Sequence, residues 1–460
     1  MGDRSILAGA TTCKVKRPMS PAAFDGTPPG SYNAALSIPP SRSGKYPEFG
    51  MPKDVAHNDP TMTLRQKRTL LGVTIGHAAH DTWYGVAPIL LASLSGQMQL
   101  SNSDIGLMLL LYQALSSVSQ PFFGRLSERV GGRPLAVGAI LWTTLMFSGT
   151  LFAHSKLVLA SCILLAGLGS GAWHPQGAAN ATISGGERLG ATTASIFFQG
   201  GTLGMALLGS ALGGYLLNAF GRDSLLLLSF ITVLVALTVV RRMVPRRVAV
   251  ARGTPRPARP NKAIIDRRLR LPLAFLLLTT ALRSLAYHSV NTYIPKYQQD
   301  LGVSPAVYGL VMSLFLIATA IGGVAGSYLA DRVGLRRVLA GSMALAAVLF
   351  FPFVRIGGVW SYACLVLSGF LFGPSHTLLV VTAQRRFPQH MAVASGIFLG
   401  FNFASGAGGA WLLGLLADQV GLSAVLGTLA WALVGASLLA LAAVPRALPG
   451  SDWKQGDSVT

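Results

Sequence analysis

The sequence predicts an all-α membrane protein in which twelve transmembrane helices form two pseudo-symmetric bundles of six. Three observations lead to this prediction. First, 51% of the 460 residues are hydrophobic and only 12% are charged, whereas a soluble domain usually carries about 25% charged residues. Second, uncharged apolar runs of about 20 residues, long enough to cross the hydrocarbon core as helices, recur from Thr69 onward. Third, the second half of the chain repeats motifs of the first.

The repeat is clearest in two short segments, GRLSERVGGRP (Gly124–Pro134) and SYLADRVGLRR (Ser327–Arg337). Four matching pairs lie 203 positions apart: Glu128 and Asp331, Arg129 and Arg332, Gly131 and Gly334, and Arg133 and Arg336. Gly106 and Gly309 share this spacing, and GLGSGAWH matches GFLFGPSH at a spacing of 202. Because each half contains an even number of spans, both halves enter the membrane from the same side, and an axis along the membrane normal relates them.

Along the chain, residues 1–66 are rich in Pro, Gly and Ser and lack apolar periodicity, so we expect a disordered cytoplasmic tail. Translation from Met51 or Met62 would remove most of it. We expect an N-terminal bundle over 67–242, a basic cytoplasmic linker over 243–269, a C-terminal bundle over 270–445 and a cytoplasmic tail over 446–460. The expected spans are 69–94, 104–123, 134–153, 157–178, 192–219, 223–242, 271–296, 305–326, 337–354, 359–382, 393–417 and 422–444.

The net charge of +21 is concentrated in alternate loops. The inside loops contain Arg125, Arg129 and Arg133; Arg188; the run from Arg241 to Arg270; Arg332, Arg336 and Arg337; Arg385 and Arg386; and Arg446. The outside loops contain at most one basic residue each: Lys156, Arg222, Lys296 and Arg355. The positive-inside rule therefore places both termini in the cytoplasm. A nucleic-acid partner is not expected, because the charge lies in loops between spans.

Twelve spans with an acid–Arg–x–Gly segment after the second and eighth resemble the major facilitator superfamily over residues 69–444. Four further segments resemble the fosmidomycin-resistance-type efflux branch of that superfamily: GHAAHD (Gly76–Asp81), YQALSSVSQPFFG (Tyr112–Gly124), GSGAWHP (Gly169–Pro175) and LRSLAYHSVNTYIP (Leu282–Pro295). The resemblance implies a monomeric transporter of the plasma or inner membrane that moves a small molecule and needs no cofactor. The second segment departs from the superfamily pattern at Ser327, where the pattern has Gly.

In the superfamily, the acid of this segment contacts a neighbouring helix end and basic residues, and it holds the cytoplasmic gate shut. The resemblance implies the same gating role here, and the alternative is a charge cluster that only fixes orientation in the membrane. The gating candidates are Gly124, Glu128, Arg129, Gly131, Arg133, Asp331, Arg332, Gly334, Arg336 and Arg337.

Two full charges lie near the centre of a span, Asp81 in the first and Arg283 in the seventh. Such charges are unfavourable in lipid and usually face partners, cavities or ion pathways. We expect Asp81 to carry a proton, tuned by His77 or His80, which are close to it along the helix. Arg283 would hold either Asp81 or an anionic substrate, because a planar guanidinium suits carboxylates and phosphonates. The structural alternative is a fixed ion pair between the two bundles.

Other polar residues of these spans are further candidates for the proton or substrate pathway. Tyr287 and Asn291 follow Arg283 at four-residue steps, on one helix face. Alignment of Pro88 with Pro295 places Asp81 on His288. The remaining candidates are Tyr84, Gln113, His174 and His376. His174 and His376 could form a polar ring at the inner gate, or each could simply bond to a helix carbonyl.

No metal site is expected, because no tight cluster of ligands appears. No nucleotide-binding loop of the GxxxxGK[ST] type occurs, so an ion gradient is the expected energy source. An enzyme is disfavoured because no nucleophile–base set stands out. The sequence therefore favours proton-coupled efflux of a small organic compound. Proton-coupled uptake of a metabolite is the first alternative, and a sensor with a transporter fold is the second.

Overall fold

The computed structural model describes residues 62–246, 267–386 and 391–444, all of which belong to one compact unit, Thr61–Thr460. The predicted cytoplasmic tails up to residue 61 and from 446, and most of the basic linker, lie outside these residues. The expected disordered tail was drawn too long at its end, because a helix already begins at Leu64, capped by Thr63. The first half contains α1 (Leu64–Leu94), α2 (Asn102–Val130), α3 (Gly132–Thr150), α4 (Lys156–Leu203), η2 (Gly204–Leu212), α5 (Gly213–Phe220), η3 (Arg222–Leu225), α6 (Leu226–Val235), η4 (Ala236–Val240) and α7 (Arg241–Met243). The second half contains α8 (Arg267–Asp300), α9 (Pro305–Val333), α10 (Leu335–Ile356), α11 (Gly358–Arg386), α12 (Met391–Val420) and α13 (Leu422–Ala443).

These elements form the twelve predicted spans. The long α4 contains two of them, because Gly186 has non-helical backbone angles (φ 60°, ψ −159°) that separate two helices. The fifth span continues through the π-helical segment η2 into α5, and the sixth runs from η3 to α7. Within the described residues, nine helices are both long and apolar enough to cross a membrane by composition alone. Helix α1 falls below that threshold because polar groups occupy its middle.

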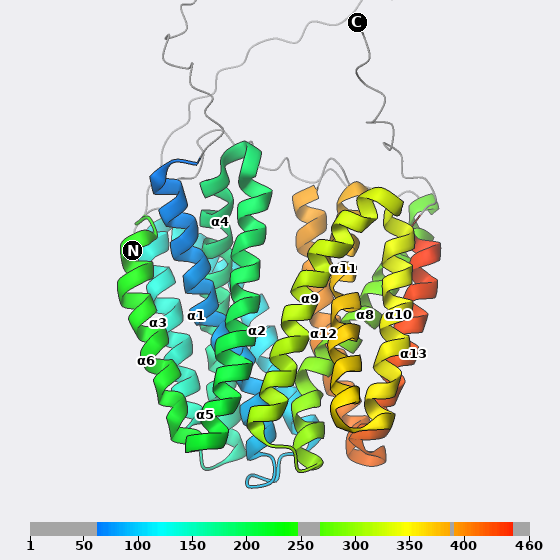
Figure 1. Cartoon of the computed structure of the whole chain (residues 1–460). Coiled ribbons are helices and arrows are strands. Elements are labelled where there is room, and N and C mark those ends of the chain that lie inside the picture. Colours follow the sequence, from blue (N-terminus) through cyan, green and yellow to red (C-terminus); the bar gives the residue numbers. More distant parts are fainter. Residues whose placement is uncertain (1–61, 247–266, 387–390, 445–460) are drawn as a thin grey trace, which may run out of the picture. The chain divides into compact units, whose positions relative to one another are not determined.

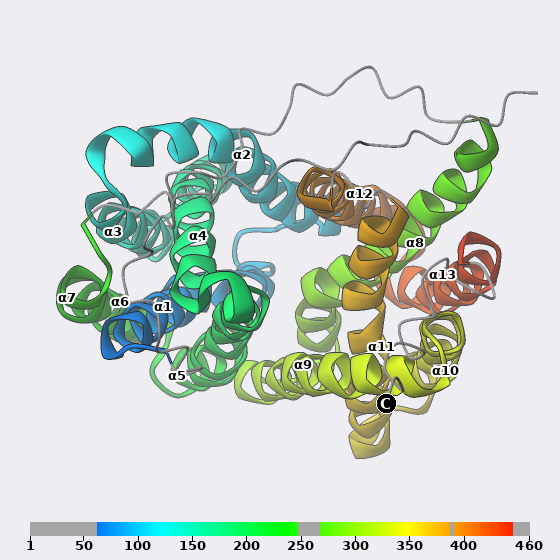
Figure 2. The same cartoon turned by 90° about the horizontal axis from the view of Figure 1, so that it is seen from above.

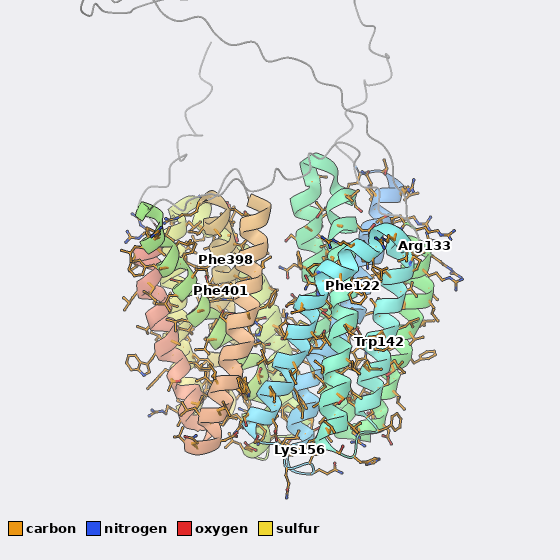
Figure 3. The ribbon with its side chains drawn as sticks, turned by 180° about the vertical axis from the view of Figure 1, so that it is seen from behind. Phe122, Arg133, Trp142, Lys156, Phe398 and Phe401 are labelled. Atoms are coloured by element: carbon orange, nitrogen blue, oxygen red, sulfur yellow. The ribbon has the colours of Figure 1, made fainter. Side chains whose placement is uncertain are left out.

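The helices separate into two groups, α1–α7 and α8–α13 (Figure 2). Large apolar side chains point outward from the first group, among them Phe122 and Trp142, as expected for a surface that faces lipid (Figure 3). Arg133 and Lys156 lie towards opposite ends of the same group. Apolar residues in the middle and charged residues at the ends are typical of a multi-pass membrane protein.

The two groups meet at the end where α1 finishes and α2 begins, and they stand apart at the other end (Figure 1). We call these the closed end and the open end. At the closed end, Asp418 at the end of α12 accepts hydrogen bonds from the backbone N–H groups of Asn102 and Ser103, at 2.7 and 3.1 Å. These are the first amides of α2, so an acid of one half caps a helix of the other.

Glycines permit two further close approaches. Gly309 of α9 and Gly214 of α5 lie across the closed end, and a Cβ on either would come within 3.1 Å of the other's Cα. Within the first half, a Cβ on Gly85 of α1 would lie 2.8 Å from the Met205 Cα, and one on Gly209 would lie equally close to the Gly85 Cα. Helix α1 and the π-helical η2 are therefore in direct backbone contact.

The two repeated segments occupy helix ends rather than long loops, because α2 and α9 extend to Val130 and Val333, beyond the expected limits of their spans. Gly131 and Gly334 are the single residues between consecutive helices, and their φ angles of 93° and 99° favour glycine.

The second arginine of each segment has the same contact in both halves. Arg133 donates through Nε to the Val244 carbonyl oxygen at 2.6 Å, and Arg336 donates to the Leu441 carbonyl oxygen at 3.0 Å through Nε. Both carbonyls lie at the end of the last span of their half. The gating role stays a prediction. Asp331 forms no ion pair with another described residue, and the side chain of Glu128 lies outside the description.

Candidate functional site

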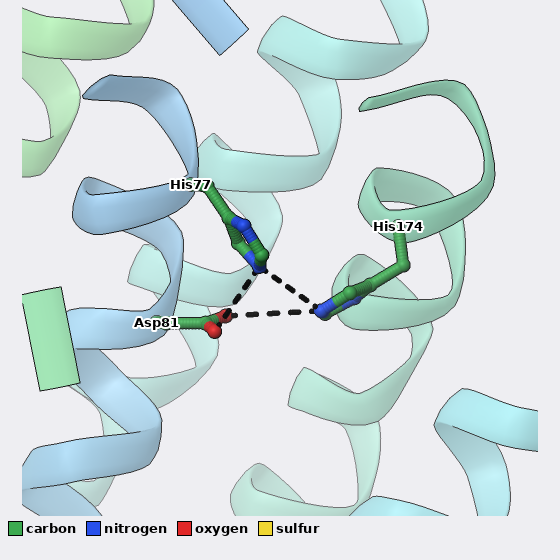
Figure 4. A group of neighbouring side chains, drawn as sticks. All are labelled: His77, Asp81 and His174. Carbon is green, nitrogen blue, oxygen red and sulfur yellow. Dashed lines mark hydrogen bonds and ion pairs between the residues drawn. The ribbon is translucent and has the colours of Figure 1, made fainter. Parts of the chain in front are cut away.

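The predicted acid lies in the middle of α1 and is surrounded by imidazoles. Asp81 Oδ2 is 3.1 Å from Nε2 of His77, one helical turn earlier, and Asp81 Oδ1 is 2.8 Å from Nδ1 of His80. A third imidazole comes from α4: His174 Nε2 is 3.9 Å from Asp81 Oδ1 and 3.3 Å from His77 Nε2 (Figure 4). We call these four residues the histidine–aspartate cluster.

The far nitrogen of two of these imidazoles faces a backbone carbonyl oxygen, which can only accept a hydrogen bond. His77 Nδ1 lies 2.8 Å from the Phe197 carbonyl oxygen, and His174 Nδ1 lies 2.9 Å from that of Ser170. We therefore assign a proton to both Nδ1 atoms. In neutral imidazoles, the two Nε2 lone pairs would then face each other across 3.3 Å.

One additional proton on His77 Nε2 removes this conflict. It can be shared between Asp81 Oδ2 and His174 Nε2, the two acceptors that Nε2 faces at 3.1 and 3.3 Å. Without it, lone pairs of His77, His174 and the carboxylate converge without a donor between them. With this assignment of tautomers, the cluster accommodates one further proton on His77 Nε2.

His80 anchors the other carboxylate oxygen. Its Nε2 contacts the Thr143 hydroxyl at 3.2 Å, and its ring stacks on Trp173 at a centroid distance of 6.0 Å. His77 and His80 are 2% and 0% exposed, whereas Asp81 is 14% and His174 is 28% exposed. The cluster is thus reached from outside through the carboxylate and His174. Gly201 completes it, because a Cβ there would lie 2.7 Å from both Asp81 Oδ2 and His77 Nε2.

The ligand atoms of His77, Asp81 and His174 lie within 4.8 Å of one another, so they could hold a metal ion. This tight group corrects the sequence expectation that no such cluster exists, which failed because His174 is distant in sequence. The observed separations of 3.1 and 3.3 Å are hydrogen-bond distances that a single proton satisfies. We therefore interpret the group as a hydrogen-bonded network.

Arg283, in the middle of α8, does not pair with Asp81. Among the described residues it forms no ion pair, and its one hydrogen bond runs from Nε to the Ser375 hydroxyl at 2.9 Å. The guanidinium lies 4.8 Å from the ring centre of Tyr287 and 5.4 Å from that of Phe372. Only 3% of the residue is exposed. The alternative of a fixed Asp81–Arg283 pair is not what the structure contains.

The other candidates divide between the halves. His376 follows Ser375, which contacts Arg283, whereas His174 contacts His77 of the first half, so the two repeat-related histidines sit in separate groups rather than in one ring. His288 follows Tyr287, the other residue against the guanidinium. We call Arg283, His288, Ser375 and His376 the arginine cluster.

A small cavity lies between the halves, on the closed-end side of both clusters. Tyr84 of α1 and Asn291 of α8 line it, together with residues of α2, η2 and α9. Tyr84 stacks on Tyr112 of its own half, with ring centres 5.4 Å apart. Asn291 donates to the Tyr287 carbonyl oxygen of its own helix, and the half-buried Gln113 makes no hydrogen bond to another described residue. Tyr84 and Asn291 are therefore the candidates that bring the two halves to one cavity.

Sequence reasoning missed several members of the site. Thr143, Ser170, Ser375 and the Phe197 carbonyl contact the two clusters, but none of these residue types is unusual in a membrane helix. Gly201 was missed as well, because a glycine within a membrane helix gives no sequence signal of its contact with Asp81.

Two related sets of six helices, with opposite charges buried in the middle of each set, define a multi-pass membrane protein of the helical transporter class. The chain matches the family model "Major Facilitator Superfamily" over residues 74–409 and again over 276–457. It belongs to this superfamily, which confirms the predicted fold.

Two relatives and one solved structure support this assignment. The chain is 26% identical to the Fosmidomycin resistance protein of Escherichia coli over 381 residues, which cover 79% of this chain and 90% of the relative. It is 23% identical to the Gentisate transporter of Corynebacterium glutamicum over 307 residues, 64% and 67% of the two chains. The crystal structure of a bacterial homolog to the human lysosomal transporter Spinster, inward-facing and occupied, superposes with a TM-score of 0.64 at 14% identity. It covers 83% of this chain and 94% of its own.

Proposed function

We propose that this protein is a proton-coupled secondary transporter that exports a small organic compound across the plasma or inner membrane. Both termini lie in the cytoplasm, so the open end faces inward, and one chain is the working unit. The bundles 67–242 and 270–445 move against each other. The observation that carries the proposal is the convergence of His77 Nε2, His174 Nε2 and the Asp81 carboxylate within hydrogen-bond range, in the middle of α1 and next to two partly exposed side chains, Asp81 and His174.

Physical reasoning supports coupling at this position. A proton held between a carboxylate and two imidazoles neutralises a buried charge that lipid would otherwise disfavour. Release of the proton leaves Asp81 charged among neutral imidazoles, so the two protonation states favour different exposure of the cluster to water. The relation to the Fosmidomycin resistance protein supports export as the direction.

The test uses the full-length protein in liposomes that contain a pH-sensitive dye. Fosmidomycin or gentisate is added on one side, and the proton movement is recorded. We expect protons to move opposite to the compound with the wild-type protein. With Asp81→Asn, substrate exchange should continue while the proton movement disappears.

Asp223→Asn is the matched control, because Asp223 is an exposed acid of the same half, and its substitution should leave coupling intact. Full coupling in Asp81→Asn would refute the proton role of the cluster. Movement of protons and compound in the same direction would instead show uptake by symport.

A further inference from the structure

The arginine cluster contains a buried cation without an acid. The acidic residues described in the second half, Asp300, Asp331 and Asp418, all lie at or near helix ends. None of these acids forms an ion pair with Arg283, although only 3% of Arg283 is exposed. Charged side chains within membrane helices are expected to pair or to line a substrate route, because an uncompensated buried charge is unfavourable. The missing partner is therefore the feature to explain.

The guanidinium is held in a defined orientation. Ser375 donates its own hydroxyl proton to the Phe372 carbonyl oxygen at 2.6 Å, so the oxygen lone pairs of Ser375 remain available to accept from Arg283 Nε at 2.9 Å. The rings of Tyr287 and Phe372 lie within cation–π distance of the guanidinium. Neither terminal nitrogen donates a hydrogen bond to another described residue. This leaves the two-nitrogen fork that binds an oxyanion in bidentate geometry.

Two imidazoles neighbour the residues that contact the guanidinium. His288 follows Tyr287, with ring centres 5.8 Å apart, and His376 follows Ser375, and neither imidazole makes a hydrogen bond to another described residue. A neutral imidazole has one N–H to donate. His376 and Tyr287 are partly exposed, so a ligand has access to this group of side chains.

We propose that the arginine cluster binds the acidic group, a carboxylate or a phosphonate, of a small organic anion, with Arg283 as its counter-charge and His288 and His376 as further donors. This inference rests on the proposed transport function and names its substrate class. A bound anion supplies the negative charge that the second half lacks, while the proton occupies the first half.

The test measures binding at equilibrium, without any gradient, to the full-length protein in nanodiscs of phosphatidylcholine. The probes are a panel of hydroxybenzoates, including gentisate, each with its neutral amide. We expect the acids to bind at least tenfold more tightly than the amides. Arg283→Gln should weaken acid binding by about 30-fold or more and leave the amides unchanged, because loss of one partner of a buried charge pair typically has effects of this size.

Three variants keep the result interpretable. Arg283→Lys should retain part of the acid preference. Ser375→Ala, which only frees the guanidinium, should weaken acid binding by about threefold to tenfold even if Arg283→Gln fails to fold. Arg336→Gln removes an arginine at a helix end and should bind acids normally. Equal binding of acids and amides by the wild type, binding of no acid in the panel, or unchanged acid binding in both Arg283→Gln and Ser375→Ala would overturn the proposal.

Two further measurements distinguish binding of an organic acid at this site from binding of other anions and from proton coupling. Inorganic phosphate alone, or phosphatidic acid in the nanodisc, should compete weakly. If either displaces the hydroxybenzoates fully, Arg283 holds a free or lipid phosphate and the proposal fails. Asp81→Asn should bind acids within about threefold of the wild type, because the two clusters share no hydrogen bond or ion pair. Loss of proton coupling together with intact acid binding in Asp81→Asn is therefore the result that both proposals predict.

Discussion

The histidine–aspartate cluster and the arginine cluster occupy equivalent places in the two halves but carry opposite charges. In the first, Asp81 has three imidazoles within 4 Å. In the second, Arg283 has a hydroxyl and aromatic faces and no acid. The packing around them is nevertheless alike: Gly201 packs against Asp81, and Gly406 packs against His288, the residue that aligns with Asp81. The glycine packing is therefore alike in the two duplicated halves, whereas the buried charge is negative in the first and positive in the second.

This difference shows that the two buried charges do not pair with each other across the halves. A pair between the halves would neutralise both groups and tie the bundles together. In the observed arrangement, Asp81 is instead surrounded by imidazoles that can share a proton. The terminal nitrogens of Arg283 donate no hydrogen bond to another described residue. We propose that the first half accepts a proton and the second half the acidic group of the substrate.

The largest expected effect comes from making the second half resemble the first. His288→Asp places a carboxylate one residue after Tyr287, whose ring centre lies 4.8 Å from the guanidinium of Arg283, and we expect it to pair with that guanidinium. Acid binding should then fall by about 30- to 5,000-fold, since a competing buried charge pair is worth about 2–5 kcal/mol. Binding of a hydroxybenzoate to the full-length variant measures this. His288→Asn has nearly the same shape without the charge and should retain most of the affinity. Equal losses in both variants would contradict the charge argument.

A smaller effect is expected inside the histidine–aspartate cluster, where the imidazoles differ in distance from the carboxylate. His77→Gln removes the nitrogen 3.1 Å from Asp81 and should slow gradient-driven transport by about tenfold, because a buried hydrogen bond to a charged group contributes about 1.5–3 kcal/mol. His174→Gln removes a partner at 3.9 Å that is 28% exposed and should slow it by about threefold. Transport rates against external pH in proteoliposomes give both values. A reversed order would show that His174, and not His77, holds the shared proton.

The smallest effect is expected at the closed end, which is also asymmetric. Asp418 caps α2 across the halves, whereas Asn218, which lies 200 positions earlier in the first half, is exposed and makes no hydrogen bond to another described residue. Asp418→Asn weakens two charge-assisted hydrogen bonds and should shift the equilibrium towards opening of this end by about fivefold, or ~1 kcal/mol. Labels on α2 and α12 in a distance measurement by fluorescence would report the shift. Asn218→Ala should produce none, and equal shifts would remove the special role of Asp418.

The sequence predicted the architecture well because hydropathy and repeat spacing act along the chain. It also placed His77 and Asp81 together, since four-residue spacing brings side chains onto one helix face. The sequence could not place His174 beside them. Contacts between two helices depend on how each helix is rotated about its axis and shifted along it, and no local sequence pattern gives these two quantities. The carbonyl acceptors of Phe197 and Ser170 carry no side-chain signal at all. In the sequence, Asp418 looks like an ordinary acid at a helix end, so its contact with α2 could not be predicted.

The backbone contact between α1 and η2 bears on how the bundles move. Because a methyl group at Gly85, Gly204 or Gly209 would clash with the facing helix, these two elements leave no slack for relative sliding. Phe197, whose carbonyl holds His77, precedes η2 on the same continuous span. We therefore expect Asp81, His77 and the Phe197 carbonyl to keep their mutual distances when the two bundles move, and the compartment whose water reaches them to change.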